Sequence, residues 1–133
     1  MTTDAATASL PKGASRRLGY AILAVALLGA AIAEAVAHGT GYWQLGAFAM
    51  APDLALFLGA GTGLAKGQLH PRAVDAYNLL HRFWGPLALL AVVGAGLLPI
   101  GYLVGGLIWA FHVAVDRSLG YGLRTRDGFQ RPR

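Results

Sequence analysis

The chain alternates between long apolar runs and short polar connections. Four apolar segments cover about residues 18–37, 42–65, 73–98 and 100–119. Each approaches or exceeds the roughly 20 residues that a helix needs to cross a bilayer core. The runs are continuous rather than alternating, and lipid admits only helices or closed barrels, so strands are disfavoured. The pattern therefore predicts an all-α fold, an integral membrane four-helix bundle with four transmembrane spans and a membrane domain over residues 18–123.

The second segment is interrupted by Pro52 and Asp53. Proline has no backbone N–H, so we expect a kink there or the start of a half-helix. Asp53 would then stand at a helix N-terminus, where the helix dipole favours a negative charge.

The composition strengthens the membrane assignment. The chain is 56% hydrophobic and 13% charged, with a mean hydropathy of +0.52. Soluble domains carry about 25% charged residues, so polar surface is too scarce here to cover a water-soluble particle. The formal net charge is +5, but the basic residues form no stripe with interleaved aromatics, so no nucleic-acid partner is expected. Cysteine is absent, which excludes disulfides, thiolate metal sites and thiol catalysis.

The lysines and arginines that flank the segments indicate the orientation. They occur before the first segment, between the second and third, and after the fourth, at Lys12, Arg16, Arg17, Lys66, Arg72, Arg124, Arg126, Arg131 and Arg133. The other two connections, 38–41 and 98–101, contain none. In a four-span arrangement all these cations lie on one side of the bilayer, which the positive-inside rule assigns to the cytoplasm. Both termini are then cytoplasmic, with residues 1–17 as a disordered tail and residues 124–133 as a basic tail.

The first segment also admits a different interpretation. Paired arginines, an apolar core and a small-residue exit at 35–37 are typical of a secretory signal. Cleavage at that exit would leave three spans. We prefer an uncleaved first helix anchored by its arginines, because three remaining spans would lack a partner for one face of the bundle.

Several polar side chains fall inside the apolar segments at similar depths. At about 1.5 Å per residue, His112 lies roughly 10 Å and His81 roughly 12 Å from the cytoplasmic ends of their segments. Asp116 follows His112 by one helical turn, on the same face. Together with Asp53 they predict one polar pocket in the cytoplasmic half of the bilayer. The residues expected to support this pocket are Tyr77, Asn78, Arg82, Arg117 and Tyr121.

Three interpretations of this pocket are open. In the first it is a hydrogen-bonded polar plug that fixes the register of the helices. In the second it is a metal site, because two imidazoles and two carboxylates suit zinc or another divalent cation, with Asp53, His81, His112 and Asp116 as ligands. In the third it is a proton or ion relay. The spacing contains no local signature, such as HExxH, that would choose among them.

Two further features concern the surface of the bundle. Glu34 and His38 form a second pair, one turn apart, near the outer end of the first segment. Their depth separates them from the inner pocket, so we expect an interfacial pair with access to water. Gly105 and Gly106 permit close helix approach, and Gly-rich faces would also allow a homo-oligomer in the lipid bilayer.

Three blocks of the sequence are similar, in order, to the motifs of one family. They are MAPDLALFLG (50–59), AYNLLHRFWGPLALL (76–90) and IWAFHVAVDRSLGYGLRTRDGF (108–129). On these motifs the chain resembles a bacterial membrane protein family catalogued as domain of unknown function 4260. The resemblance implies a multi-pass protein of the bacterial cytoplasmic (inner) membrane with no established activity. The polar positions of the family would carry over as Pro52, Asp53, Tyr77, Asn78, His81, His112, Asp116, Arg117, Tyr121 and Gly122.

These observations support three functional hypotheses. The first is a structural or partner-binding membrane protein built around the polar pocket. The second is a metal-dependent membrane hydrolase that acts on a lipid-like substrate. The third is a small proton- or ion-coupled transporter. The sequence identifies no catalytic residue, so whether the protein is an enzyme stays open at this point.

Overall fold

The described part of the chain folds into helices joined by irregular segments. A computed structural model describes residues 11–132. Its elements are α1 (Ala14–His38), α2 (Tyr42–Met50), the 3₁₀ turn η1 (Ala51–Asp53), α3 (Leu54–Leu58), the 3₁₀ turn η2 (Pro71–Ala73), α4 (Val74–Leu80), α5 (Trp84–Gly94) and α6 (Gly101–Leu119). The extended pairing in this range is an isolated bridge between Arg124 and Gln130. The predicted all-α class is confirmed.

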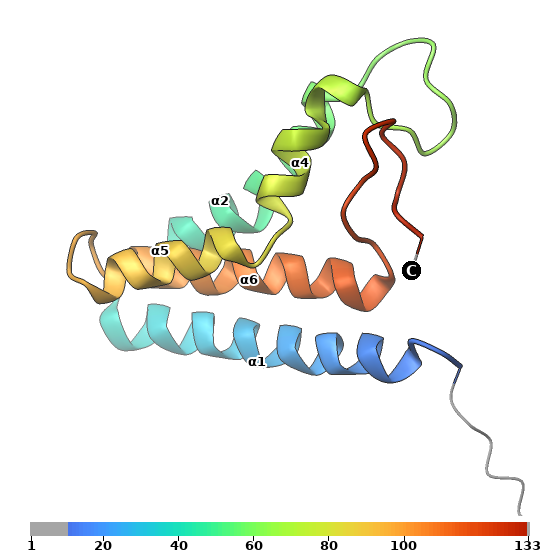
Figure 1. Cartoon of the computed structure of the whole chain (residues 1–133). Helices are drawn as coiled ribbons and strands as arrows, with labels where there is room; N and C mark the ends of the chain where they lie inside the picture. The colour runs from blue at the N-terminus through green and yellow to red at the C-terminus, as the bar shows by residue number, and fades with distance from the viewer. Residues whose placement is uncertain (1–10, 133) are drawn as a thin grey trace, which may run out of the picture.

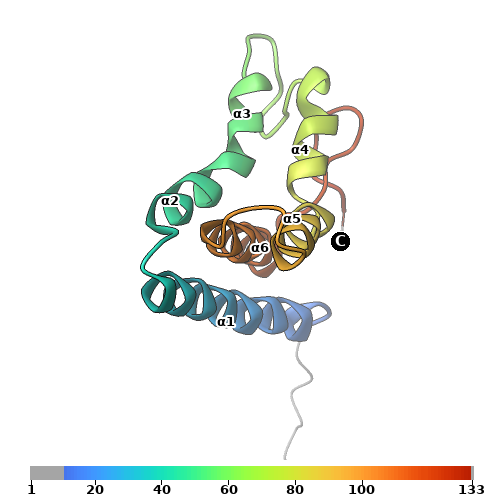
Figure 2. The same cartoon turned by 90° about the vertical axis from the view of Figure 1, so that its left-hand side faces the viewer.

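Two long antiparallel helices form the base of the molecule. α1 runs along α6, and α5 and α2 flank α6 on its two sides (Figures 1 and 2). α3 and α4 stand side by side away from this base and are joined by the loop 59–70 (Figure 2). The elements that contain Asp53 and His81 therefore lie on the side of α6 that faces away from α1.

Small side chains set the close packing of α1 on α6. Ala31 and Ala35 pack with Val104 and Ile108 in one buried cluster. Because alanine keeps the side chains short, the two helix backbones approach closely along their length.

Glycines on α6 let two other helices approach as well. A Cβ at Gly105 would lie 2.9 Å from the Phe48 ring, and one at Gly106 would lie 2.6 Å from Leu90 Cδ2. The predicted close approach is confirmed, and these contacts are made within one chain. A contact with a second copy would have to use other glycines, such as Gly46, around which a Cβ would meet open space.

The second apolar segment is interrupted where Pro52 indicates. α2 ends at Met50 and α3 begins at Leu54, with Pro52 buried in η1 between them. Asp53 occupies the N-cap position of α3, but its side chain makes no capping hydrogen bond there. The helix also ends at Leu58 rather than near residue 65, because the glycine-rich stretch that follows disfavours helix.

The third apolar segment, predicted as one span over 73–98, is interrupted between α4 and α5. Pro86 in the first turn of α5 accounts for the interruption, since its ring conflicts with the carbonyl of residue 82 in a continuous helix. The interruption leaves His81 as the C-cap of α4, with its ring free to turn toward α6. The structure thus differs from the predicted single segment, and the difference positions a candidate ligand.

Side chains of α6 pair with the carbonyl groups released at this interruption. Trp109 Nε1 donates to the carbonyl oxygen of Leu80 at 2.8 Å, and Arg117 Nη2 donates to that of His81 at 2.6 Å. Unpaired buried carbonyls are destabilising in protein or lipid. The two donors therefore stabilise the interruption and fix it against α6.

Substitution of Trp109 with phenylalanine is expected to lower the free energy of unfolding by about 1–3 kcal/mol, because the carbonyl of Leu80 loses its donor in a buried position. Thermal or denaturant unfolding of the detergent-solubilised protein would measure this loss. Trp84→Phe is the matched control, because Trp84 is highly exposed. Equal losses in the two variants would show that the hydrogen bond is unimportant.

The two ends of the chain differ from the predicted tails. α1 begins at Ala14, so residues 14–17 are helical, and residues 1–10 of the predicted disordered tail lie outside the described residues. At the other end, residues 121–132 fold back toward α4 and the loop 59–70 (Figure 1). The predicted basic tail 124–133 is therefore part of the folded structure as far as residue 132.

Hydrogen bonds to the backbone hold this C-terminal segment in place. The Asn78 side chain pairs with both backbone groups of Arg124, donating to its oxygen at 3.1 Å and accepting from its nitrogen at 2.7 Å. The Leu69 N–H donates to the carbonyl oxygen of Gly128 at 2.9 Å. Gly128 has a φ of 93°, and a Cβ there would lie 1.8 Å from the Leu69 oxygen, so this position requires glycine.

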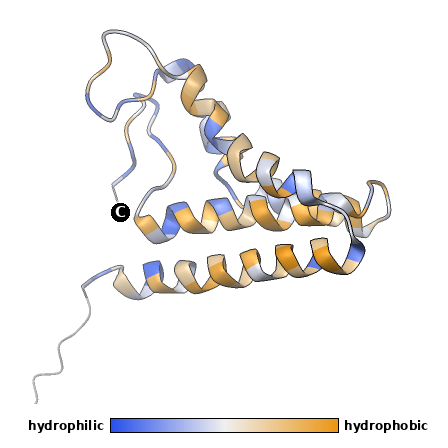
Figure 3. Ribbon diagram, turned by 180° about the vertical axis from the view of Figure 1, so that it is seen from behind, coloured by the Kyte–Doolittle hydropathy of each residue, from blue (hydrophilic) through white to orange (hydrophobic). Residues whose placement is uncertain are grey.

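Many large apolar side chains are exposed. Hydrophobic residues run along most of the α1 and α6 ribbons in Figure 3. Among the described helices, α1 alone has the length and composition for a membrane crossing, with a mean hydropathy of 2.1 over its most apolar window. That window is 17% buried, so α1 is not a covered core helix in this structure. Phe57 on α3 and Trp84 on α5 are each 77% exposed. On α1 the exposed apolar side chains Leu18, Ile22 and Val25 follow one another at helical spacing, and an extended apolar surface of this kind is rare on soluble monomers.

Candidate metal site

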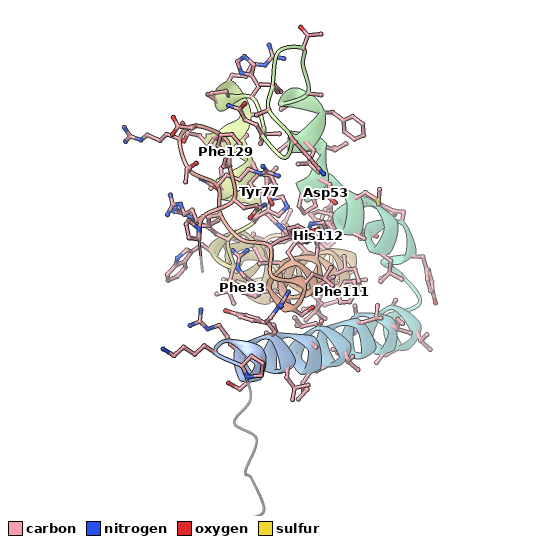
Figure 4. All side chains as sticks on the ribbon, turned by 90° about the vertical axis from the view of Figure 1, so that its right-hand side faces the viewer. Asp53, Tyr77, Phe83, Phe111, His112 and Phe129 are labelled. Atoms are coloured by element: carbon pink, nitrogen blue, oxygen red, sulfur yellow. The ribbon has the colours of Figure 1, made fainter. Side chains whose placement is uncertain are left out.

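Four polar side chains meet where the interrupted segments lie against α6. Asp53 ends η1, His81 caps α4, and His112 and Asp116 lie one turn apart on α6. In Figure 4, Asp53, Tyr77 and His112 gather above the α6 ribbon. The structure therefore brings together the four residues that the sequence placed at similar depths. We refer to Asp53, His81, His112 and Asp116 as the His/Asp cluster.

The facing atoms of the His/Asp cluster are closely spaced. The two imidazole Nε2 atoms lie 3.4 Å apart. Asp53 Oδ1 lies 3.4 Å from Nε2 of His81 and 3.5 Å from Nε2 of His112. Asp116 Oδ2 lies 3.4 Å and 3.8 Å from the same two nitrogens. One potential ligand atom from each of Asp53, His81 and His112 falls within 4.8 Å of the others, which suits a shared metal ion.

Backbone carbonyl groups fix the orientation of both imidazoles. His81 Nδ1 lies 2.8 Å from the carbonyl oxygen of Tyr77, and His112 Nδ1 lies 2.8 Å from that of Ala49. A carbonyl oxygen only accepts hydrogen bonds, so each Nδ1 carries a proton and donates it. In the neutral rings both Nε2 atoms then present lone pairs to each other and to the two carboxylates. In this protonation state the centre of the cluster holds acceptors alone, which a metal ion, an added proton or a water molecule would pair.

Solvent reaches the cluster from one side. The His81 side chain is fully buried, whereas the Asp53 side chain is 42% exposed. His112 and Asp116 lie between these extremes, at 11% and 19%. Asp53 is therefore the member of the His/Asp cluster that is most accessible from outside the protein.

Tyr77 and Arg124 support the imidazole of His81. The Tyr77 ring is stacked on this imidazole with 3.9 Å between centroids, and Arg124 Cζ lies 4.9 Å from the Tyr77 centroid. Arg124 also donates from Nη1 to the carbonyl oxygens of Gly67 and Gly128, at 3.0 and 2.8 Å. The folded C-terminal segment thus restrains a ring that carries one of the candidate ligand atoms.

The other predicted supporting residues differ in what they contact. The guanidinium group of Arg117 contacts the site by donating to the backbone carbonyl oxygen of His81. Asn78 instead anchors the C-terminal segment. Arg82 is exposed and makes no hydrogen bond or ion pair with the described residues of the cluster, and Tyr121 contributes only backbone groups, to Asp116 and Arg117.

The pair at the far end of α1 is separate from the His/Asp cluster, as expected. His38 Nε2 lies 3.0 Å from Glu34 Oε2, and both side chains are partly exposed. These residues offer a second histidine–carboxylate pair in a different environment, which makes them useful controls.

Sequence reasoning missed three contributors to the site. Ala49 supplies a carbonyl group, which no residue type reveals. Trp109 fixes the interruption next to His81, and its signal was an indole N–H that needs an acceptor within an apolar segment. Arg124 stacks on Tyr77, but its surroundings in the sequence are those of a solvated basic tail.

The fold and the cluster together define a strongly apolar, all-α protein with a histidine–aspartate site of metal-binding geometry. Residues 19–132 match the model of the family described as Domain of unknown function (DUF4260), and the chain belongs to that family. The resemblance in the sequence blocks is thereby confirmed, and the match includes the folded C-terminal segment. Comparison with curated proteins and with solved structures gave no match.

Proposed function

We propose that this protein binds a divalent metal ion at the His/Asp cluster. One observation carries the proposal: the two Nε2 atoms face each other at 3.4 Å while both Nδ1–H groups donate to backbone carbonyls. Histidines that bind metals almost always donate their other ring N–H to a carbonyl, a carboxylate or water, which fixes the tautomer and the ring orientation. Both imidazoles of this cluster have that arrangement.

The spacing of the ligand atoms suits zinc. Zinc–nitrogen and zinc–oxygen bonds of about 2.0–2.2 Å place the ligand atoms of a tetrahedral site about 3.3–3.6 Å apart. The distances among Asp53 Oδ1 and the two Nε2 atoms, 3.4 to 3.5 Å, fall in that range. Asp116 Oδ2 is farther from His112, at 3.8 Å. A site made of Asp53, His81 and His112 would therefore keep its fourth position open, with Asp116 beside it. Nitrogen and oxygen donors without thiolate favour zinc or another borderline divalent ion.

The plug and the proton relay are the competing functions of the same residues. A plug stabilises helix register through donor–acceptor pairs, whereas the neutral cluster presents acceptors alone. In a plug or a proton relay, these acceptors would be paired by protons instead of a metal ion. Both therefore predict that the purified protein contains no stoichiometric metal, which separates them from our proposal.

We further propose that the chain crosses the membrane four times with both termini in the cytoplasm. α1 is long, apolar and largely uncovered, and α6 at 19 residues has a length of about 28 Å, close to the thickness of a bilayer core. The second and third spans would be interrupted helices, which membranes tolerate where protein groups pair the released backbone. Trp109 and Arg117 supply such pairing. The packing of α1 along α6 supports an uncleaved first helix.

Exposure beside Asp53 favours hydrolysis as the chemistry of the site. A divalent ion held with one open position supplies Lewis-acid chemistry for hydrolytic reactions. Asp53 is the partly exposed member of the cluster, and the neighbouring Leu54 and Phe57 are exposed apolar side chains. An apolar surface next to the accessible carboxylate suits a lipid-like substrate.

The test is the metal content of the full-length protein, purified in detergent after growth with added zinc and manganese. Elemental analysis is expected to find about one metal ion per chain in the wild type. The double variant His81→Gln and His112→Gln is expected to contain none. Glu34→Gln with His38→Gln is the matched control, because it alters the other histidine–carboxylate pair. A wild-type protein without metal would contradict the proposal and leave the plug or the relay.

A further inference from the structure

We propose that a basic site at the start of α1 binds the phosphate group of an anionic phospholipid. The inference rests on the membrane placement proposed above. A cavity of about 460 Å³ is lined by Lys12, Gly13, Arg16, Arg17 and Gly120. A neighbouring cavity of about 260 Å³ is lined by Arg16, Tyr20, Arg117, Gly122, Leu123 and Arg131. Arg16 lines both cavities, which we call together the basic site.

The basic site is complementary to an anion. Its lining includes cations from both ends of the chain and no aspartate or glutamate. The side chains of Lys12 and Arg16 are exposed and make no hydrogen bond or ion pair with any residue in the range 11–132. A guanidinium group matches two phosphate oxygens at once, and an ammonium group adds a compact positive charge. These two side chains therefore provide the donors for a phosphate group.

Arg17 has a different, structural role in the same place. Its guanidinium donates to the carbonyl oxygens of Ser118, at 3.1 Å, and Leu119, so it caps the C-terminus of α6. Gly120 follows with a φ of 95°, and a Cβ at that position would collide with the Arg17 guanidinium. The cap thus joins α1 to α6, and Arg17 and Gly120 both line the larger cavity.

The position of the basic site favours a lipid over an anion from solution. Arg16 lies two residues before Leu18, where the exposed apolar surface of α1 begins, and Ile22 and Val25 continue that surface. In a spanning α1 this boundary falls at the level of the lipid headgroups. A phosphate bound there would have its acyl chains along an apolar helix face, which a free anion cannot use.

The test measures lipid binding to the full-length protein in detergent by native mass spectrometry. Phosphatidylglycerol and phosphatidylcholine with the same acyl chains are titrated in parallel. The wild type is expected to prefer phosphatidylglycerol by about ten-fold or more, and Lys12→Gln with Arg16→Gln is expected to remove most of this preference. Lys66→Gln with Arg126→Gln is the matched control, because it makes the same change in net charge outside the basic site.

Three results would overturn the inference. They are equal affinity of the wild type for the two lipids, equal loss of preference in both double variants, and complete displacement of phosphatidylglycerol by inorganic phosphate. Flotation of the wild type with vesicles of phosphatidylcholine alone is measured in the same preparation. A protein that does not float contradicts the membrane placement itself, whereas one that floats without preferring phosphatidylglycerol contradicts this inference alone.

Discussion

Zinc is expected to stabilise the wild-type protein by about 2.7 kcal/mol when its free concentration is 100 times the dissociation constant, because only the folded chain assembles the ligands. The variant His112→Ala is expected to lose this stabilisation. It removes one Nε2 atom and leaves the other facing two carboxylates without a second nitrogen. Thermal unfolding in detergent, with added zinc and with chelator, would measure the effect.

His38→Ala is the control for this experiment. It also removes an imidazole that lies beside a carboxylate, but on α1 and outside the His/Asp cluster. The control is expected to keep the full zinc-dependent shift. A wild-type shift that persists in His112→Ala would mean that zinc stabilises the protein at some other place.

The second large effect is expected for Gly128→Ala, which should lower the free energy of unfolding by about 2–3 kcal/mol through backbone strain and a lost hydrogen bond. The added Cβ would collide with the Leu69 carbonyl oxygen, and the Leu69–Gly128 hydrogen bond could not form. Release of the C-terminal segment would make its backbone flexible, so that trypsin could cleave after Arg124 and Arg126. Limited proteolysis together with unfolding would therefore report the change.

Gly63→Ala is the control that has the backbone strain of a positive φ without the collision with Leu69. Gly63 also has a positive φ, 74°, but a Cβ there would meet nothing within 4 Å. The control is expected to lose only about 1–2 kcal/mol and to keep wild-type resistance to trypsin. Equal proteolysis of the two variants would show that the C-terminal segment does not depend on its contact with Leu69.

A helix interruption could be predicted from the sequence where a proline causes it. Pro52 indicated the interruption in the second segment because proline lacks an N–H, and η1 lies there. Pro86 carries the same signal, yet the long apolar run around it favoured one continuous span. The missed interruption decides where the His81 ring lies, because it makes His81 the end of a helix.

The meeting of the two imidazoles was predictable from the positions of His81 and His112 along their segments. A constant rise per residue placed His81 and His112 at matching levels, and their Nε2 atoms lie 3.4 Å apart. The rotation of the helices was not predictable, because it is set by packing between segments. For the same reason Asn78 was assigned to the pocket although it binds the backbone of Arg124.

The fold of the C-terminal segment could not be predicted from the pattern of residue types. Arginine-rich termini are typical of solvated tails, and this one has no hydrophobic periodicity. It is held instead by contacts with backbone groups, such as the Leu69–Gly128 and Asn78–Arg124 hydrogen bonds. Such contacts depend on conformation rather than on residue type.

The place of the site residues along the chain sets the order of events during synthesis. Asp53 and His81 are made early, whereas His112, Asp116 and Arg124 belong to the last part of the chain. On the proposed membrane placement, the nascent protein inserts most of its apolar helices before the complete ligand set exists. On the proposed function, the metal ion can bind only after His112 has been made, and a product that stops before residue 112 keeps the exposed apolar surface of α1 but has no metal site.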